Sequence, residues 1–121
     1  MNILFICSAN KLRSKTADDY FSAKYPHISF QSAGTNHKTC QKEGTTPLEE
    51  WMLEWADLVY AMEHKHRKEI KKHVGDKYDK KTVVLGIKDD YKYYQTELIA
   101  LLEEKCLKLK DDQTGGNKSC Q

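Results

Sequence analysis

A chain of 121 residues is long enough to form one domain with a hydrophobic core of its own. Charged residues make up 31% of the chain and apolar residues 39%, and no apolar run approaches the roughly 20 residues that span a bilayer. The net charge is only +2 and charges of both signs are interspersed, which argues against a nucleic-acid-binding protein. The opening NILFIC follows no basic region and precedes no small-residue cleavage site, so we expect neither a signal peptide nor a membrane partner.

The cysteines do not suggest a disulfide framework. No CxxC pair and no regular spacing connects the four of them, Cys7, Cys40, Cys106 and Cys120. We therefore predict a cytoplasmic protein with reduced thiols, in which a cysteine is free for chemistry. Only two of the 20 basic residues are arginines, Arg13 and Arg67, so the position of each arginine is informative.

Strands alternate with helices along the chain. A continuous apolar run over 2–7 predicts a strand buried on both faces. A helix is expected over 14–25, with Ser14 at its N-cap and Pro26 as its stop. The later predicted elements are, in chain order, a strand over 28–32, a polar loop over 36–45, a helix that starts near 46, a strand over 57–62, a helix over 63–74, a strand over 82–87 and a helix over 96–109. We expect one domain over 1–110 and a flexible tail over 111–121.

A capping box marks the helix that follows the polar loop. Thr46 precedes Pro47, and Glu49 lies three residues after Thr46. An apolar face follows at helical spacing, and its tryptophans, Trp51 and Trp55, are expected to pack in the core. The alternation of strands and helices predicts a doubly wound α/β fold with a parallel sheet. Such sheets bind ligands at the carboxyl ends of their strands. We therefore expect a site in the segments that follow the predicted strands, after Ile6, Ser32, Met62 and Ile87.

One candidate site lies between the first strand and the first helix, in the segment Cys7-Ser8-Ala9-Asn10-Lys11-Leu12-Arg13-Ser14. Five residues between cysteine and arginine can curl into a ring of inward N–H groups, and the helix N-terminus behind them adds partial positive charge. Such a ring binds a phosphate dianion, and an arginine holds two of its oxygens through the planar guanidinium. The expected phosphate-binding residues are Ser8, Ala9, Asn10, Lys11, Leu12 and Arg13.

The same field favours Cys7 as a thiolate nucleophile. Ser14 can donate its hydroxyl to the sulfur, and Asn10 can brace the loop through its side-chain amide. The ordinary alternative is a buried cysteine at a strand end, because free cysteine packs like a small hydrophobe. Asn10, Ser14 and the strand–loop–helix context together favour the functional interpretation.

The segment NILFICSANKLRS resembles the N-terminus of the low-molecular-weight protein tyrosine phosphatase family, whose signature is Cys-x-x-Asn-x-x-Arg-Ser after a first strand. Further stretches agree in order over 1–109: SAGT at 32–35, ADLVYAME at 56–63, and IKDDY at 87–91, which resembles the family's late Asp-Pro-Tyr segment. The resemblance implies a four-stranded parallel sheet in the order 2-1-3-4 with helices on both faces. It also implies a cysteine-dependent phosphatase that hydrolyses phosphate monoesters, phosphotyrosine first among them, through a phosphocysteine and without cofactor or metal.

The resemblance places the general acid at Asp89, with Asp90 where proline usually stands. One carboxyl group can protonate the leaving oxygen and later activate water. Both residues follow the fourth predicted strand, so Asp90 is the fallback, although adjacent acids are also an ordinary loop signal. Tyr91 matches an aromatic wall that contacts phosphotyrosine in the family. We therefore assign Cys7, Arg13 and Asp89 as the catalytic residues.

The chain also departs from the family pattern. It is shorter between Gly34 and Asp57, a region that helps to wall the substrate cleft, and Lys15 stands where many members have proline. Activity on an aryl phosphate is therefore the firmer expectation, and selectivity for phosphotyrosine proteins the weaker one. The expected partners are a phosphorylated protein or a small aryl phosphate, and we expect a monomer.

Three other functions share parts of this pattern. An arsenate reductase uses the same loop but relays a disulfide through two further cysteines that lie close together, or through an external thiol. A phosphocarrier of the sugar-phosphotransferase B-subunit type has a cysteine after its first strand but needs neither Arg13 nor a late aspartate. A non-catalytic phosphate-binding regulatory protein could keep the loop alone. A metal site is not expected, because His64 and His66 face different ways on a helix.

Overall fold

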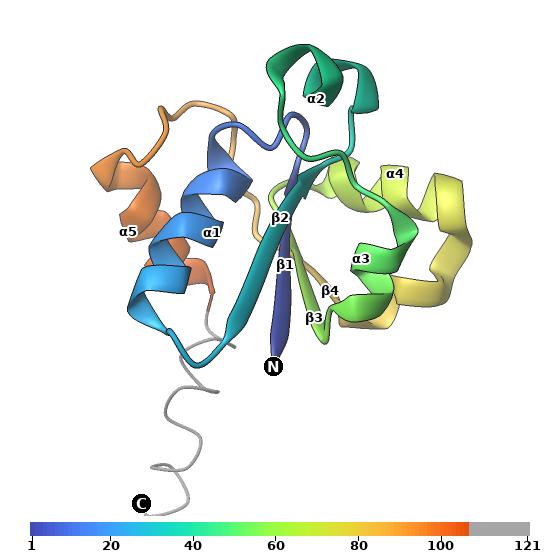
Figure 1. The fold of residues 1–121 in the computed structure, drawn as a ribbon, viewed down its shortest axis with the longest axis horizontal. Coiled ribbons are helices and arrows are strands. Elements are labelled where there is room, and N and C mark those ends of the chain that lie inside the picture. Colours follow the sequence, from blue (N-terminus) through green and yellow to red (C-terminus); the bar gives the residue numbers. More distant parts are fainter. Residues whose placement is uncertain (107–121) are drawn as a thin grey trace, which may run out of the picture.

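Four parallel strands form one sheet in the order β2-β1-β3-β4 in the computed structural model, which describes residues 1–106 (Figure 1). The strands are β1 (Asn2–Cys7), β2 (Ser29–Gly34), β3 (Leu58–Ala61) and β4 (Thr82–Val84). The order and the parallel directions confirm the predicted fold class. The predicted tail over 111–121, its boundary at 110, and Cys120 lie outside the described residues.

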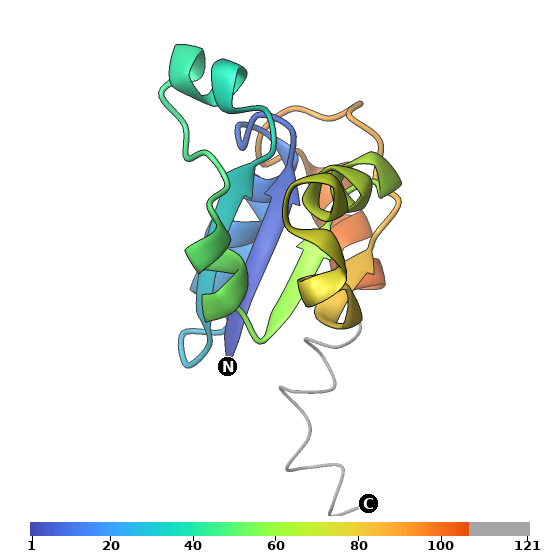
Figure 2. The same cartoon turned by 90° about the vertical axis from the view of Figure 1, so that its right-hand side faces the viewer.

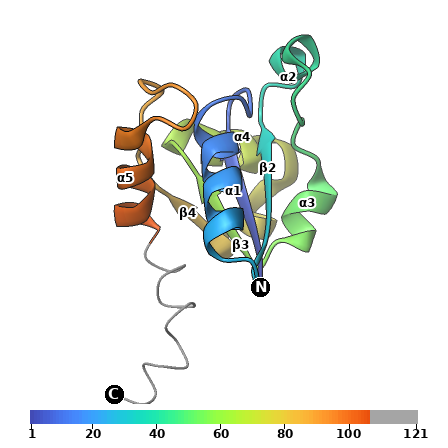
Figure 3. The same cartoon turned by 60° about the vertical axis from the view of Figure 1, so that its left-hand side comes forward.

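Helices cover both faces of the sheet. On one face lie α1 (Arg13–Lys24) and α5 (Thr96–Lys105), and on the other lie α3 (Glu50–Trp55) and α4 (His64–Val74), as Figures 1 and 3 show. A short 3₁₀ helix, η1 (Gly75–Lys81), joins α4 to β4. The remaining helix, α2 (His37–Glu43), lies beyond the end of the sheet. Among residues 1–106, no helix has the length and apolar character needed to cross a membrane.

Strand β1 is the centre of both hydrophobic cores. All four residues from Ile3 to Ile6 are fully buried. Their side chains alternate, so Ile3 and Phe5 enter the core under α1 and α5, whereas Leu4 and Ile6 enter the core under α3 and α4. Phe5 stacks on three aromatic rings, those of Phe21, Phe30 and Tyr60. The continuous apolar run in the sequence therefore reflects burial on two sides.

The prediction of a polar loop over 36–45 is wrong, because this segment contains α2. The Asn36 side chain accepts a hydrogen bond from the Thr39 backbone N–H at 3.0 Å and caps the helix start. Gly44, with a left-handed φ of 71°, ends it. Cys40 is the buried residue of this helix. The two caps were visible in the sequence, but the segment between them lacks an apolar periodicity.

The predicted capping box of the next helix is also wrong. Helix α3 begins at Glu50, and Pro47 instead forms an isolated parallel bridge with Gly34 at the end of β2. Trp51 is 51% exposed, contrary to the expected core position, while Trp55 is partly buried against the core. The chain between α2 and α3 is extended around Pro47 because it pairs with the end of β2, which leaves only a short helix for α3.

Strand β4 is shorter than the predicted 82–87. It pairs with β3 from Thr82 to Val84, and Gly86 then takes a left-handed φ of 71°. Ile87 is nevertheless held to the sheet, because its N–H donates to the Met62 carbonyl at 2.8 Å. The segment that follows β4 therefore begins at a fixed position. Figure 2 shows this segment (orange), the loop after β1 (blue) and α2 at the same end of the molecule.

The end of β2 lies directly against the loop that follows β1. A Cβ atom on Gly34 would lie 2.5 Å from the Ser8 carbonyl oxygen and 2.5 Å from the Cys40 sulfur. Thr35 N–H donates to the Cys7 carbonyl, and Asn36 N–H donates to the Ser8 carbonyl, both at 2.9 Å. Only glycine permits this approach, so Gly34 determines how closely the two segments pack.

We predict that Gly34→Ala lowers the free energy of unfolding by about 2 kcal/mol, because the backbone of the neighbouring loop must move. Urea denaturation measures the change. Gly44→Asn is the matched control: no atom lies within 4 Å of a Cβ there, and asparagine tolerates the left-handed conformation. An equal loss in both variants would contradict the packing argument.

Candidate functional site

The loop after β1 ends in a helix start that differs from the prediction. Helix α1 begins at Arg13, and its N-cap is Leu12, which makes no side-chain capping bond. Ser14, predicted as the N-cap, lies inside the helix and is fully buried. The predicted N-cap is therefore wrong, because the Ser14 hydroxyl bonds within the loop instead of capping the helix.

Two groups of the loop contact the Cys7 sulfur. The Asn10 backbone N–H donates to it at 3.2 Å, and the Ser14 hydroxyl oxygen lies 2.9 Å away. Ser14 also donates to the Asn10 side-chain oxygen at 2.8 Å. Since a hydroxyl has one hydrogen, Ser14 accepts from a Cys7 thiol in this arrangement and can turn its hydrogen to a thiolate. The Ser14 hydroxyl thus lies beside the sulfur, as expected from the sequence, whereas the contact from the Asn10 backbone N–H was not predicted.

Asn10 holds the curl of the loop. Its φ is 52°, a left-handed conformation that asparagine adopts more readily than most residues. Its side-chain amide donates to the Ser32 carbonyl of β2 at 3.3 Å, and its side-chain oxygen accepts from Ser14. Asn10 is 3% exposed, so these bonds are shielded from water. The bracing contacts expected for this residue are present.

Arg13 is buried, with 2% of its surface exposed, and it joins three segments of the chain. Its Nη1 donates to Glu63 Oε2 at 2.5 Å and to the Ile87 carbonyl at 2.8 Å. Its Nε has no hydrogen-bond partner among residues 1–106 and lies 3.6 Å from Asp89 Oδ1. The hydrogen bond from Arg13 is the main cause that lowers the pKa of Glu63, so Glu63 stays anionic. The guanidinium is thus oriented by hydrogen bonds from Nη1, and among residues 1–106 its Nε–H donates no hydrogen bond and has only the longer ion pair with Asp89.

His66 is a second buried group at this site, and the sequence did not predict it. It is 0% exposed, and its Nδ1 accepts from the Glu63 backbone N–H at 3.0 Å. Its Nε2 lies 2.9 Å from the Ser8 hydroxyl. Burial, and then the nearby charge of Arg13, lowers the pKa of His66 to about 4. The imidazole is therefore neutral at pH 7.

Glu63 and His66 form a capping box at the start of α4. The Glu63 carboxylate accepts from the His66 backbone N–H while the imidazole accepts from the Glu63 N–H. Their spacing of three residues, directly after the third strand, is the signal that sequence analysis could have used. It was missed because histidine is an unusual member of a capping box.

The segment after β4 brings Asp89 toward the loop. Asp89 is exposed, yet one of its oxygens lies near Arg13 Nε, whereas Asp90 is exposed with no contact to Arg13 described. Tyr91 is half-buried and packs against the core under α1 and α5. Of the two predicted candidates for the acid, Asp89 is therefore the one next to the loop.

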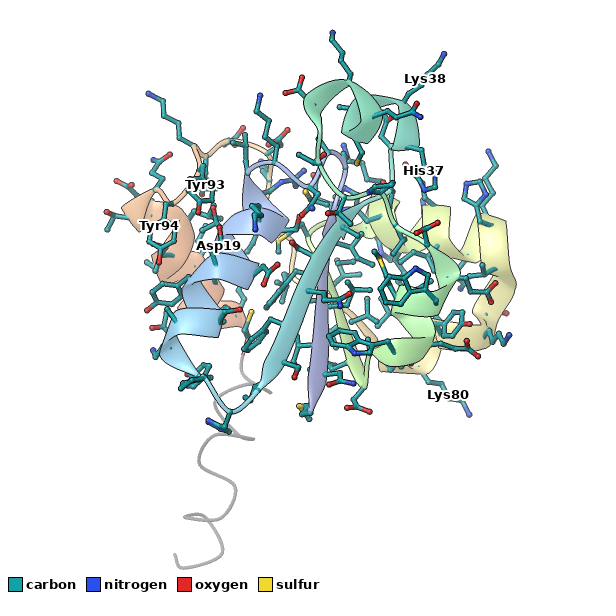
Figure 4. The ribbon with its side chains drawn as sticks, in the orientation of Figure 1. Asp19, His37, Lys38, Lys80, Tyr93 and Tyr94 are labelled. Carbon is teal, nitrogen blue, oxygen red and sulfur yellow. The ribbon has the colours of Figure 1, made fainter. Side chains whose placement is uncertain are left out.

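Two tyrosines tie this segment to α1, as Figure 4 shows for Tyr93, Tyr94 and Asp19. The Tyr93 hydroxyl donates to Asp19 Oδ2 at 2.5 Å, which is the main cause that raises the pKa of Tyr93 to about 12. The Tyr94 N–H donates to the Thr16 hydroxyl at 2.9 Å, and Tyr94 has a φ of 61°. The segment that carries Asp89 is thus held at both ends, by Ile87 on the sheet and by Tyr94 on α1.

Helix α2 and the chain after it hold the outer side of the loop. Lys11 forms an ion pair with Glu43 at 2.7 Å, and the Thr45 hydroxyl donates to the Ala9 carbonyl at 2.5 Å. Beside these contacts lies a cavity of about 520 Å³, lined by Asn10, Lys11 and the exposed Trp51 among others. The region that is short in this chain therefore still contacts the loop.

No group of three or more histidine, cysteine, aspartate or glutamate side chains in residues 1–106 is placed to bind a metal ion. Cys106 is buried in the core, and burial raises the pKa of its thiol to about 12.

The chain is similar to known phosphatases. No protein-family model matches the chain. A protein-arginine-phosphatase of Bacillus subtilis (strain 168) is 29% identical over 149 residues, which cover 93% of this chain and 99% of the relative. Because the alignment is longer than this 121-residue chain, the relative carries additional segments.

Two solved structures are similar over nearly their whole length. The solution structure of a low-molecular-weight protein tyrosine phosphatase from Bacillus subtilis is 27% identical, with a TM-score of 0.69, and the match covers 93% of this chain and 99% of that one. A YwlE arginine phosphatase whose active-site cysteine is replaced by a phosphorylated serine is 25% identical, with a TM-score of 0.68 and coverage of 93% and 97%. Both belong to the kind of phosphatase that the loop resembles.

The buried imidazole predicts an acid-sensitive step in stability. The unfolded chain, with a histidine pKa near 6.5, takes up a proton more readily than the folded chain, in which the pKa of His66 is about 4. This contribution is fully present above pH 6.5 and is lost as the pH falls toward 4. Between pH 7 and pH 5 we expect the free energy of unfolding to fall by about 2 kcal/mol through His66 alone.

Urea unfolding at both pH values tests this expectation. His66→Gln should lose less stability than wild type between pH 7 and pH 5, because glutamine does not titrate. His64→Gln, at an exposed position of the same helix, should behave as wild type. The same loss in wild type and His66→Gln would show that the imidazole is not responsible.

Proposed function

We propose that this chain, which belongs to the low-molecular-weight protein tyrosine phosphatase family and is a cysteine-based phosphatase, hydrolyses aryl phosphate monoesters through a phosphocysteine on Cys7. Family membership supplies the reaction type. The geometry of this chain supports the assignment of the catalytic residues and of the substrate class.

The buried guanidinium of Arg13 is the observation that carries the proposal. A cation with 2% of its surface exposed must be compensated. Glu63 and the Ile87 carbonyl accept hydrogen bonds from Nη1, and the Asp89 carboxylate forms a longer ion pair with Nε at 3.6 Å. The buried Nε–H has no hydrogen-bond partner among the described residues, which is costly unless an acceptor binds there. A phosphoryl oxygen beside the Cys7 sulfur supplies that acceptor.

In the first step the Cys7 thiolate attacks phosphorus. A sulfur–phosphorus bond forms as the bond to the leaving oxygen breaks, and Asp89 gives its proton to that oxygen. The inward amides of the loop and Arg13 bind the equatorial oxygens, where negative charge is concentrated in the transition state. The Asn10 N–H and the Ser14 hydroxyl stabilise the sulfur anion before attack.

In the second step water hydrolyses the phosphocysteine. The Asp89 carboxylate accepts a proton from the attacking water, the sulfur–phosphorus bond breaks, and inorganic phosphate leaves with Cys7 again a thiolate. One aspartate thus serves as acid and then as base. The position of Asp89 next to Arg13 Nε supports this assignment over Asp90.

The segment that carries Asp89 supports an aryl leaving group. Tyr91 lies two residues after Asp89 and is half-buried, with part of its ring packed against the core, and aromatic rings favour stacking with aryl groups. A disulfide-relay reductase is less well supported, because Cys106 lies in the core, where burial raises the pKa of its thiol, and Cys40, which lies against the loop carbonyls, is also fully buried. A second candidate substrate is phosphoarginine, because the curated relative is a protein-arginine-phosphatase.

Turnover of para-nitrophenyl phosphate tests the residue assignment. We expect Cys7→Ser to have no measurable turnover and Asp89→Asn to lose about 100-fold or more in kcat. Asp90→Asn is the matched control and should stay within about threefold of wild type. An active Cys7→Ser would refute the mechanism, and exchanged results for the two aspartates would move the acid to Asp90.

A pair of peptides tests the substrate class. We expect kcat/KM for a phosphotyrosine peptide to exceed that for the same peptide with phosphoarginine by about tenfold or more, which corresponds to about 1.4 kcal/mol in the transition state. Phosphate release by wild type measures both. The reverse preference would support the second candidate and leave the Cys7 chemistry intact.

A further inference from the structure

A hydrogen bond joins the first residue of the phosphate loop to the start of α4. The Ser8 hydroxyl and His66 Nε2 lie 2.9 Å apart, although the two residues are 58 positions apart in the chain. The mechanism above uses the Ser8 backbone but not its side chain. His66 is fully buried and also has no role in that mechanism.

The capping box determines which imidazole nitrogen carries the hydrogen. Nδ1 faces the Glu63 backbone N–H at 3.0 Å, and a backbone N–H can only donate. Nδ1 must therefore present its lone pair, so the hydrogen of the neutral ring is on Nε2. Protonation of Nδ1 would place two hydrogens against each other, which agrees with the lowered pKa of this histidine.

Nε2–H consequently donates to the Ser8 oxygen and orients it. A hydroxyl that accepts in one direction keeps its own hydrogen for an acceptor elsewhere. Ser8 directly follows Cys7 and is half-buried, with its oxygen held on the side of the site where α4 begins. Arg13 is bound to the same helix start through Glu63. The start of α4 therefore contacts both ends of the loop, Ser8 through His66 and Arg13 through Glu63.

We propose that His66 is a positioning residue that fixes the Ser8 hydroxyl as a hydrogen-bond donor to a phosphoryl oxygen. This inference rests on the proposed function only in taking the loop as the phosphate site. Ser8 adds a side-chain donor to the ring of backbone amides, and His66 keeps its hydrogen available. A pre-oriented donor binds an oxyanion more tightly than one that must first be ordered.

Binding of inorganic phosphate, measured by titration calorimetry at pH 7, tests the proposal without turnover. Ser8→Ala should weaken binding about 10- to 100-fold, the range for a hydrogen bond to a charged group. His66→Asn keeps an acceptor at the Nδ1 position but is too short to reach Ser8, so we expect a loss of about tenfold. His66→Gln can both accept and donate, and should recover most of that loss.

Two further variants separate positioning from structural support. His64→Asn, on an exposed position two residues away, should bind phosphate as wild type does. The double variant Ser8→Ala/His66→Asn should bind no more weakly than Ser8→Ala, because both changes remove the same donor. Thermal unfolding of each variant shows that it is folded.

The proposal is overturned if Ser8→Ala binds within twofold of wild type, if the two losses add, or if Asn and Gln at position 66 are equivalent. It is also overturned if wild type does not bind phosphate. Expected binding results in a wild type that lacks turnover would instead refute the proposed phosphatase mechanism and leave this inference standing.

Discussion

The burial of the Arg13 guanidinium is the interaction on which the site depends. A cation removed from water has to be compensated by the protein, and here one nitrogen takes both compensating bonds, to Glu63 and to the Ile87 carbonyl. Those two partners come from the segments after β3 and β4, so a single side chain fixes the positions of three loops at the carboxyl edge of the sheet. The charge is oriented before any ligand arrives, which is the condition for electrostatic stabilisation of an oxyanion.

The start of α4 combines a structural and a functional role. Its capping box satisfies backbone groups that every helix start leaves unpaired, and the same two side chains reach the phosphate loop at Arg13 and at Ser8. The arrangement has a cost in stability at low pH, because a neutral buried imidazole resists protonation. The contact to the Ser8 hydroxyl and the acid sensitivity therefore come from the same residue, His66.

The connection between β2 and β3 supports the outer side of the loop that follows β1. Helix α2 contacts the loop through the Lys11–Glu43 ion pair, and the chain after it does so through the Thr45 hydroxyl. Gly34 allows β2 to end directly against Ser8. The same connection leaves Trp51 exposed beside a cavity of about 520 Å³. The outer wall of the site is thus formed by α2, the chain after it and Trp51, and these segments are separate from the loop that carries Cys7.

The sequence by itself determined the fold class and the position of the loop from Cys7 to Arg13 between the first strand and the first helix. An apolar strand, a loop from Cys7 to Arg13 and a helix are neighbours in the chain, so their geometry follows from local propensity and spacing. Only the tertiary structure decided which groups surround Arg13, since Glu63 and Ile87 lie 50 and 74 positions away. It also decided that Trp51 is exposed and that His66 reaches the loop. Contacts between distant segments depend on how helices pack across the sheet, and periodicity within one segment carries no information about them.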